Sequence, residues 1–180
     1  MENATSNRKQ RRHRLYALLI CMGIFASVFQ LSAFVEVDEA ERQEVNDMMI
    51  EKMKTVDGKG IFLNNVYLGL MMFVPAVGFL FGVMSSALTG VTFSAIAQVN
   101  NIDMPAFLLL FGSPFGLMEL LAYGIGMSRS VLLVHKVTKK HTRHFTRIEI
   151  RNIFTEVGIV VGLLLAGGVI EAYMIGNPIF

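Results

Sequence analysis

The sequence predicts an all-helical membrane protein with about five transmembrane helices, the fourth of them kinked or broken near Pro114. Three observations lead to this prediction. Apolar residues make up 53% of the 180-residue chain and charged residues only 17%. The charges are confined to the N-terminus, to residues 36–59 and to residues 129–156, apart from three isolated acids, so that residues 60–102 carry none. Long apolar stretches without charge are typical of helices that span a membrane.

The first predicted transmembrane helix covers residues 15–35 and follows a basic tail. Residues 1–14 hold five Lys or Arg and one acid, whereas the 21 residues 15–35 carry no charge. The run ends in FVEVDEAE, which lacks the small residues of a signal-peptide cleavage site. We therefore expect an uncleaved helix, with the tail 1–14 in the cytoplasm according to the positive-inside rule.

Residues 36–60 are predicted to form an extracytoplasmic loop. They hold eight acids and four bases, and their apolar residues recur at a loosely helical spacing. This spacing allows a short amphipathic helix at the membrane surface. Met48, Met49 and Met53 are soft side chains that copper accepts, but no His or Cys lies nearby, so we interpret them as the apolar face of this helix.

Residues 61–175 are predicted to form a bundle of four further helices. The 39 uncharged residues 61–99 exceed the about 20 that one span needs, so we interpret them as a hairpin that turns at residues 85–90. Three crossings, at 61–83, 88–101 and 106–130, then connect the outer loop to a basic loop at 135–151. The last span, 153–175, returns and leaves 176–180 outside the cell.

The loop 135–151 contains six Lys or Arg against one acid, which favours the cytoplasm and contact with anionic lipid heads. We predict no nucleic-acid partner, because no aromatic platform accompanies the basic residues. His135, His141 and His144 are not predicted to bind a metal, since Glu149 is the only carboxylate beside them. The chain also lacks a phosphate-binding glycine loop and a nucleophile elbow, so we predict no catalytic residue and no cofactor.

Polar side chains inside the predicted spans are the candidate site. Glu119 lies in the middle of the apolar run 106–134, where an unpaired charge is expensive, so we expect it to be protonated or bonded to a donor. Asn64 or Asn65, at the outer start of the second span, is the candidate donor. Glu171 lies near the outer end of the last span. In contrast, Glu156 is expected to extend toward the cytoplasmic surface.

Proline and small residues shape the same spans. Pro114 lacks a backbone donor, which predicts the break in the fourth span, and Gly116 shares the helical face of Glu119. Arg129 lies on a different face and is a poor partner for Glu119. Small residues four apart allow helices to approach closely, and the candidates for this packing are Gly78, Gly82, Gly112, Gly158, Gly162 and Ala166.

Three short segments of the chain are informative together: FLNN at 62–65, PFGLMELLA at 114–122 and LAGGVIEAY at 165–173. Their order and spacing resemble the Asn-Asn, Pro-His-Gly-x-x-Glu-Leu and Ala-x-x-Ile-Glu-Ala motifs of the stage II sporulation protein M family. Phe115 replaces that family's histidine, and the third span lacks its Asn-Gly pair. The resemblance implies an integral membrane protein that works within membrane complexes, one of which organises septal cell-wall hydrolases.

We therefore expect a non-enzymatic scaffold or accessory subunit of a larger membrane complex in the cell membrane. Its partners are expected to be other integral membrane proteins, in a homo- or hetero-oligomer. One alternative is a small transporter or channel that uses Glu119 and Glu171. Another is a structural subunit of a membrane enzyme, such as a metalloenzyme, whose active site lies in another chain.

Overall fold

The computed structural model describes residues 2–55, 58–138 and 146–176, and these residues form helices and no strand. Four helices are long and apolar enough to cross a membrane, within the ranges Arg11–Ser32, Val77–Val99, Pro114–Thr138 and Arg147–Met174. In chain order the helices are α1 (Glu2–Ser32), α2 (Glu39–Thr55), α3 (Gly58–Met71), α4 (Val77–Val99), α5 (Ala106–Phe111), α6 (Pro114–Thr138) and α7 (Arg147–Gly176).

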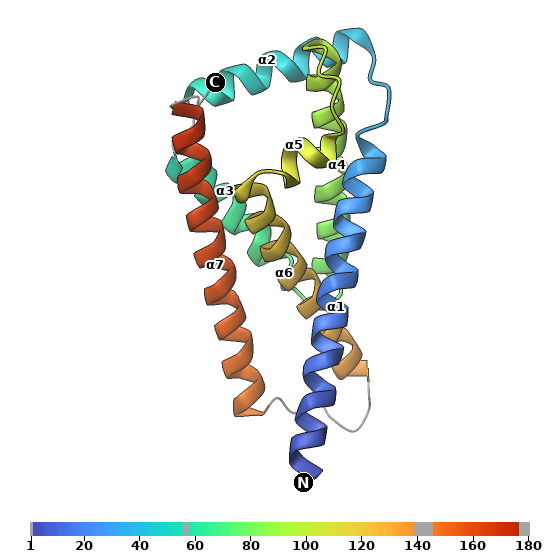
Figure 1. Cartoon of the computed structure of the whole chain (residues 1–180), viewed down its shortest axis with the longest axis vertical. Helices are drawn as coiled ribbons and strands as arrows, with labels where there is room; N and C mark the ends of the chain where they lie inside the picture. The colour runs from blue at the N-terminus through green and yellow to red at the C-terminus, as the bar shows by residue number, and fades with distance from the viewer. Residues whose placement is uncertain (1, 56–57, 139–145, 177–180) are drawn as a thin grey trace.

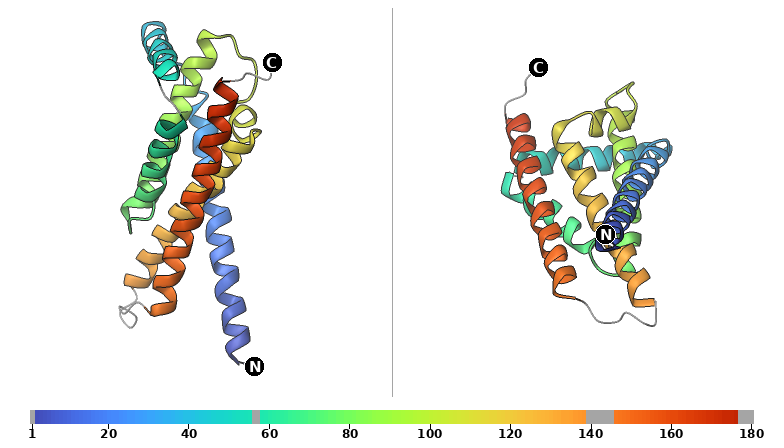
Figure 2. Two further views of the ribbon diagram at one scale, coloured as in Figure 1. Left: turned by 90° about the vertical axis from the view of Figure 1, so that its left-hand side faces the viewer. Right: turned by 60° about the horizontal axis from the view of Figure 1, so that its bottom comes forward.

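Helix α6 lies at the centre of the bundle and packs against α1, α3, α4, α5 and α7 (Figures 1 and 2). The four long helices run along the long axis of the molecule, and α2 lies across the end opposite the N-terminus (Figure 1). Helix α3 packs mainly against α7, whereas α4 packs mainly against α1. This arrangement surrounds α6 with helices, which explains why more of its residues are buried than in any other of the four candidate spans.

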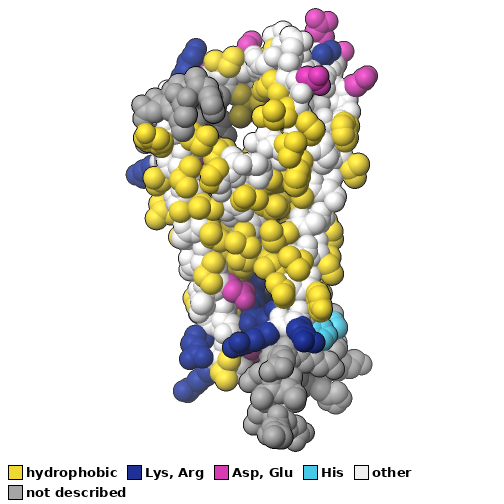
Figure 3. All heavy atoms as spheres, in the orientation of Figure 1, with side chains coloured by type: hydrophobic (Ala, Val, Ile, Leu, Met, Phe, Trp, Pro, Cys, Tyr) yellow, Lys and Arg dark blue, Asp and Glu magenta, His cyan; other side chains and the backbone are white. Residues whose placement is uncertain are grey.

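Charge separates the two ends of the molecule (Figure 3). The end that we call the basic end carries Arg11, Arg12, Arg14, Lys136, Arg147 and Arg151. The end that we call the acidic end is formed by α2, with Glu39, Glu41, Glu44, Asp47 and Glu51. Between them lies a wide band of exposed apolar side chains (Figure 3). A band of this kind identifies an integral membrane protein. Which end faces the cytoplasm stays a prediction.

The turn predicted at residues 85–90 was wrong, because α4 is continuous from Val77 to Val99. The chain instead turns at residues 72–76, between α3 and α4, where Pro75 is followed by Ala76 with φ 66°. Ser130 of α6 holds this turn: its hydroxyl donates to the Val74 carbonyl at 2.8 Å and accepts from the Phe79 N–H at 3.3 Å. Proline lacks the N–H that a helix interior needs, so the helix ends before Pro75 and the chain turns there.

Small residues explain why α4 continues through the run that we interpreted as a turn. Its buried residues include a stripe with a spacing of four, formed by Gly78, Gly82, Ser86, Gly90 and Ser94. The two serines of this stripe bond to the α1 chain segment: the Ser86 hydroxyl donates to the Phe25 carbonyl of α1 at 2.6 Å, and the Ser94 hydroxyl donates to the Val35 carbonyl, just after the end of α1, at 2.7 Å. In a membrane helix, serine and glycine thus serve close packing rather than a turn.

The helix boundaries also differ from the predicted ones. Helix α1 begins at Glu2 rather than at residue 15, since the basic tail contains good helix formers, and it ends at Ser32. Helix α3 has 14 residues and is about 21 Å long, which is shorter than the about 30 Å bilayer core. The predicted number of about five spans is therefore reached only if this short helix is counted with the four long ones. The loop 36–60 contains the helix α2, and residues 139–145 and 177–180 lie outside the described residues.

The helix breaks near Pro114, as predicted. Helix α5 ends at Phe111 and α6 begins at Pro114. The Ser113 hydroxyl accepts from the Gly116 N–H at 3.1 Å, and the Ser113 carbonyl accepts from the Leu117 N–H at 3.1 Å. Ser113 is therefore the N-cap of α6 and Pro114 occupies its first position, where the missing N–H has no cost.

Candidate functional site

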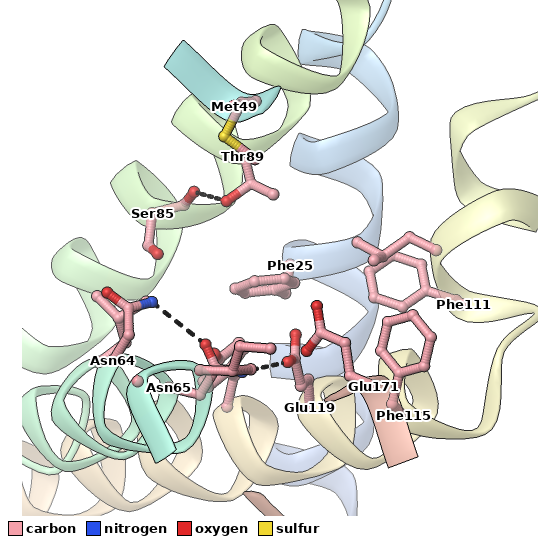
Figure 4. A pocket seen from close by; sticks show the side chains of 15 residues that line it. Phe25, Met49, Asn64, Asn65, Ser85, Thr89, Phe111, Phe115, Glu119 and Glu171 are labelled. Carbon is pink, nitrogen blue, oxygen red and sulfur yellow. Dashed lines mark hydrogen bonds between the residues drawn. The ribbon is translucent and has the colours of Figure 1, made fainter. Parts of the chain in front are cut away.

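A cavity of about 330 Å³ lies inside the bundle near the acidic end, and each of the helices α1 to α7 contributes to its walls. Four polar residues from the predicted spans line it together: Asn64, Asn65, Glu119 and Glu171. They come from α3, α6 and α7, so helices far apart in the sequence bring these side chains to one place (Figure 4).

A short chain of hydrogen bonds connects the amides to one carboxylate. The Asn65 amide donates to Glu119 Oε1 at 2.5 Å, and the Asn64 amide donates to Asn65 Oδ1 at 3.3 Å. Asn65 is thereby the direct neighbour of Glu119, while Asn64 orients Asn65. This arrangement joins α3 to α6 across the bundle.

The carboxyl group of Glu171 points toward that of Glu119 inside the cavity (Figure 4). It makes no hydrogen bond with another side chain or backbone group of the described residues. Glu171 is half-buried, so its carboxyl group can still be reached by a ligand or water that enters the cavity. Glu171 is therefore the group best placed to contact a molecule in the cavity.

Aromatic rings form much of the remaining wall, from Phe25, Phe111, Phe115 and Tyr123. The rings of Phe25 and Tyr123 contact each other at a tilt of 39°, with their centroids 5.5 Å apart. Phe115 lies beside the two carboxyl groups, where the resemblance led us to note a missing histidine. Aromatic faces and carboxylates both attract cations, so the lining suits a cation with an apolar body.

The glycines predicted to pack helices differ in what surrounds them. A side chain at Gly82 would meet Met127 of α6, and Gly78, Gly112 and Gly116 each lie against a backbone carbonyl group of their own region. Gly158 and Gly162, in contrast, have nothing within 4 Å of the place where a Cβ would lie, and Ala166 is exposed. The small residues of α7 that face the bundle are Gly167 and Gly168 instead.

A second polar cluster, at the basic end, was missed by the sequence analysis. The Glu156 carboxylate of α7 accepts two hydrogen bonds from the Arg129 guanidinium of α6, and Arg14 of α1 donates to the same carboxylate at 2.9 Å. Glu156 is therefore paired inside the bundle rather than extended to the surface. Residues 129 and 156 lie at nearly equal distances from the middle of the loop 135–151, and in a helical hairpin this symmetry predicts that they meet.

The histidines and methionines that we considered as metal ligands lie in different parts of the structure. His135 is exposed near the end of α6, while His141 and His144 lie outside the described residues. Met49 lines the cavity and Met48 is exposed, and the side chain of Met53 is not among those described. Among the residues that the structure describes, no group of three His, Cys, Asp or Glu side chains lies close enough to hold a metal ion.

The apolar band, the partly buried ion cluster and the cavity with its four polar side chains define a polytopic helical membrane protein with an internal polar site. The chain belongs to the stage II sporulation protein M family, whose family model matches residues 15–174. Comparison with curated proteins and with solved structures gave no match. The segments that carry the family resemblance, around Asn65, Glu119 and Glu171, meet at the cavity.

Proposed function

We propose that the protein is a non-enzymatic scaffold or accessory subunit of a larger membrane complex. The observation that supports this most is the outer face of α7, where Gly158, Gly162 and Ala166 are exposed along three turns. Small residues on a lipid-facing surface let a second helix approach closely, and such contacts hold membrane complexes together. The proposal keeps the predicted orientation, with the basic end in the cytoplasm of the cell membrane.

The bond between Asn65 and Glu119 supports the same proposal. This bond links α3 to the central helix α6 through the carboxylate of Glu119, so Glu119 has a structural role. A rigid bundle with a small-residue face on one side has the properties of an assembly subunit.

The substitution Gly162→Leu tests this proposal. Gly162 is exposed and nothing lies within 4 Å of its Cβ position, so a leucine there extends away from the bundle and the fold should be kept. Loss of one close helix contact is expected to raise the dissociation constant of the assembly about tenfold, the factor that 1.4 kcal/mol represents, and so to lower the assembled fraction. Size-exclusion chromatography and crosslinking of the full chain, extracted in mild detergent, measure that fraction.

Gly23→Leu is the matched control, because Gly23 of α1 is also exposed with nothing within 4 Å of its Cβ position. This variant should assemble like the unchanged protein. If Gly162→Leu assembles normally too, or if the unchanged chain purifies only as a lone monomer, the proposal is wrong.

A second candidate function, a small transporter or channel, is favoured by the cavity that contains Glu119 and Glu171. Its aromatic and acidic lining suits a small organic cation. In this case Glu171→Gln should reduce tetraethylammonium uptake into proteoliposomes to the level of protein-free liposomes, while leaving assembly intact. Glu39→Gln, at an exposed acid of α2, is the control and should not change uptake. Uptake that is insensitive to Glu171→Gln excludes this candidate.

A further inference from the structure

A groove between α1 and α6 at the basic end combines positive charge with apolar walls. It encloses about 310 Å³ and lies on one side of the Arg14–Arg129–Glu156 cluster. Its polar part is formed by Arg11, Arg14 and Arg129, and its apolar part by Leu15, Leu18 and Ile125. We call it the arginine groove. Neither the cavity near the acidic end nor the outer face of α7 is part of it.

The charges of the arginine groove do not balance. Two guanidinium groups, of Arg14 and Arg129, share the carboxylate of Glu156, and Arg11 adds a third cation at the rim. The next carboxylate, of Glu149, is already paired with Lys136, so it does not remove the surplus. The Arg129 side chain is only 8% exposed, so its charge is poorly reached by water. A cluster with surplus positive charge in such surroundings is stabilised by a further anion. Guanidinium groups bind phosphate especially well, through paired N–H donors.

The position of the groove indicates the source of this anion. Lys and Arg side chains gather where the apolar band ends, at the depth of lipid head groups (Figure 3). From there the apolar wall follows α1 toward the middle of the bundle, and Leu18 lies over Gly124 of α6. A free phosphate ion would use only the arginines, whereas a phospholipid would also cover the leucine side chains with an acyl chain.

We propose that the arginine groove binds the phosphate group of an anionic glycerophospholipid, with one acyl chain along Leu15 and Leu18. The surplus of cations favours a lipid with net negative charge over a zwitterionic one. The bound lipid is a ligand of one defined site between two helices, distinct from general attraction between the basic loop and the membrane surface.

Native mass spectrometry of the full chain in detergent tests this proposal, since micelles of neutral detergent lack the surface field of an anionic bilayer. The unchanged protein should retain one phosphatidylglycerol in preference to phosphatidylcholine. Arg14→Gln should weaken phosphatidylglycerol binding about fivefold, the factor that corresponds to about 1 kcal/mol for one basic residue. Arg12→Gln is the matched control, because Arg12 is exposed on the same helix and does not line the groove. It should leave binding unchanged.

Arg11→Gln is a second variant that does not disturb the buried ion cluster. It should weaken binding in the same direction, so the test does not depend on the folding of Arg14→Gln. Equal losses for Arg12→Gln and Arg14→Gln would show that only overall charge matters, and would overturn the proposal. Complete displacement of the lipid by millimolar inorganic phosphate would overturn it as well, because the site would then recognise a free anion.

Discussion

Glu156→Ala is expected to lower the free energy of unfolding by up to about 3–5 kcal/mol, the effect of removing one partner from a fully buried ion pair, because Arg129 is buried while Glu156 is partly buried. The carboxylate of Glu156 is shared by Arg14 and Arg129, so its loss leaves two guanidinium groups of α1 and α6 facing each other without an anion between them. Arg129 cannot turn toward water easily, because its side chain is 8% exposed. Unfolding of the purified protein in mixed micelles, followed by circular dichroism, measures the change.

A double substitution separates the charge effect from the loss of packing. Arg129→Met combined with Glu156→Leu removes both buried charges and keeps side-chain volume, so most of the stability should return. Arg14, with a side chain 31% exposed, then remains free to reach the membrane surface. If the double variant is as unstable as Glu156→Ala, the ion cluster is not the cause of the loss.

Gly90→Ala is expected to lower the free energy of unfolding by about 1–3 kcal/mol, the range for overpacking a tight contact. The added methyl group would press against the backbone carbonyl of Phe29 and lie 2.8 Å from the Ser32 Cβ, both on α1. Backbone atoms of a neighbouring helix cannot rotate away as a side chain can. The two helices must therefore separate at their crossing, which also lengthens the bond from Ser86 to Phe25.

Gly23→Ala provides the matched control with the opposite expected sign. Gly23 lies on α1 with open space around its Cβ position, so alanine should keep or raise stability through its better helix propensity, by up to about 1 kcal/mol. The same unfolding measurement compares the two variants directly. Equal changes at Gly23 and Gly90 would mean that close packing between α1 and α4 does not contribute.

The predicted turn illustrates where local pattern was ambiguous. Serine, threonine and glycine around residues 85–90 are turn residues in water, yet in a membrane the same residues allow two helices to touch. The spacing of four from Gly78 to Ser94 was the signal that distinguishes the two, since a helical period continuing through the run predicts one helix. The observed turn contains Pro75, which is the one proline in the uncharged stretch 60–102.

The sequence by itself determined that this is a membrane protein. The membrane core excludes charged side chains, so the spanning helices appear in the sequence as long segments with almost no charge. It also determined the break before α6, since proline and a serine N-cap act within a few residues of each other. The sequence also indicated the candidate donors to Glu119, but it left the choice between Asn64 and Asn65 open. Only the tertiary structure decided that Asn65 makes the bond, and that Arg14 of α1 joins Arg129 at the carboxylate of Glu156. These choices depend on how the helices rotate and tilt against α6, because that rotation determines which side chains face each other.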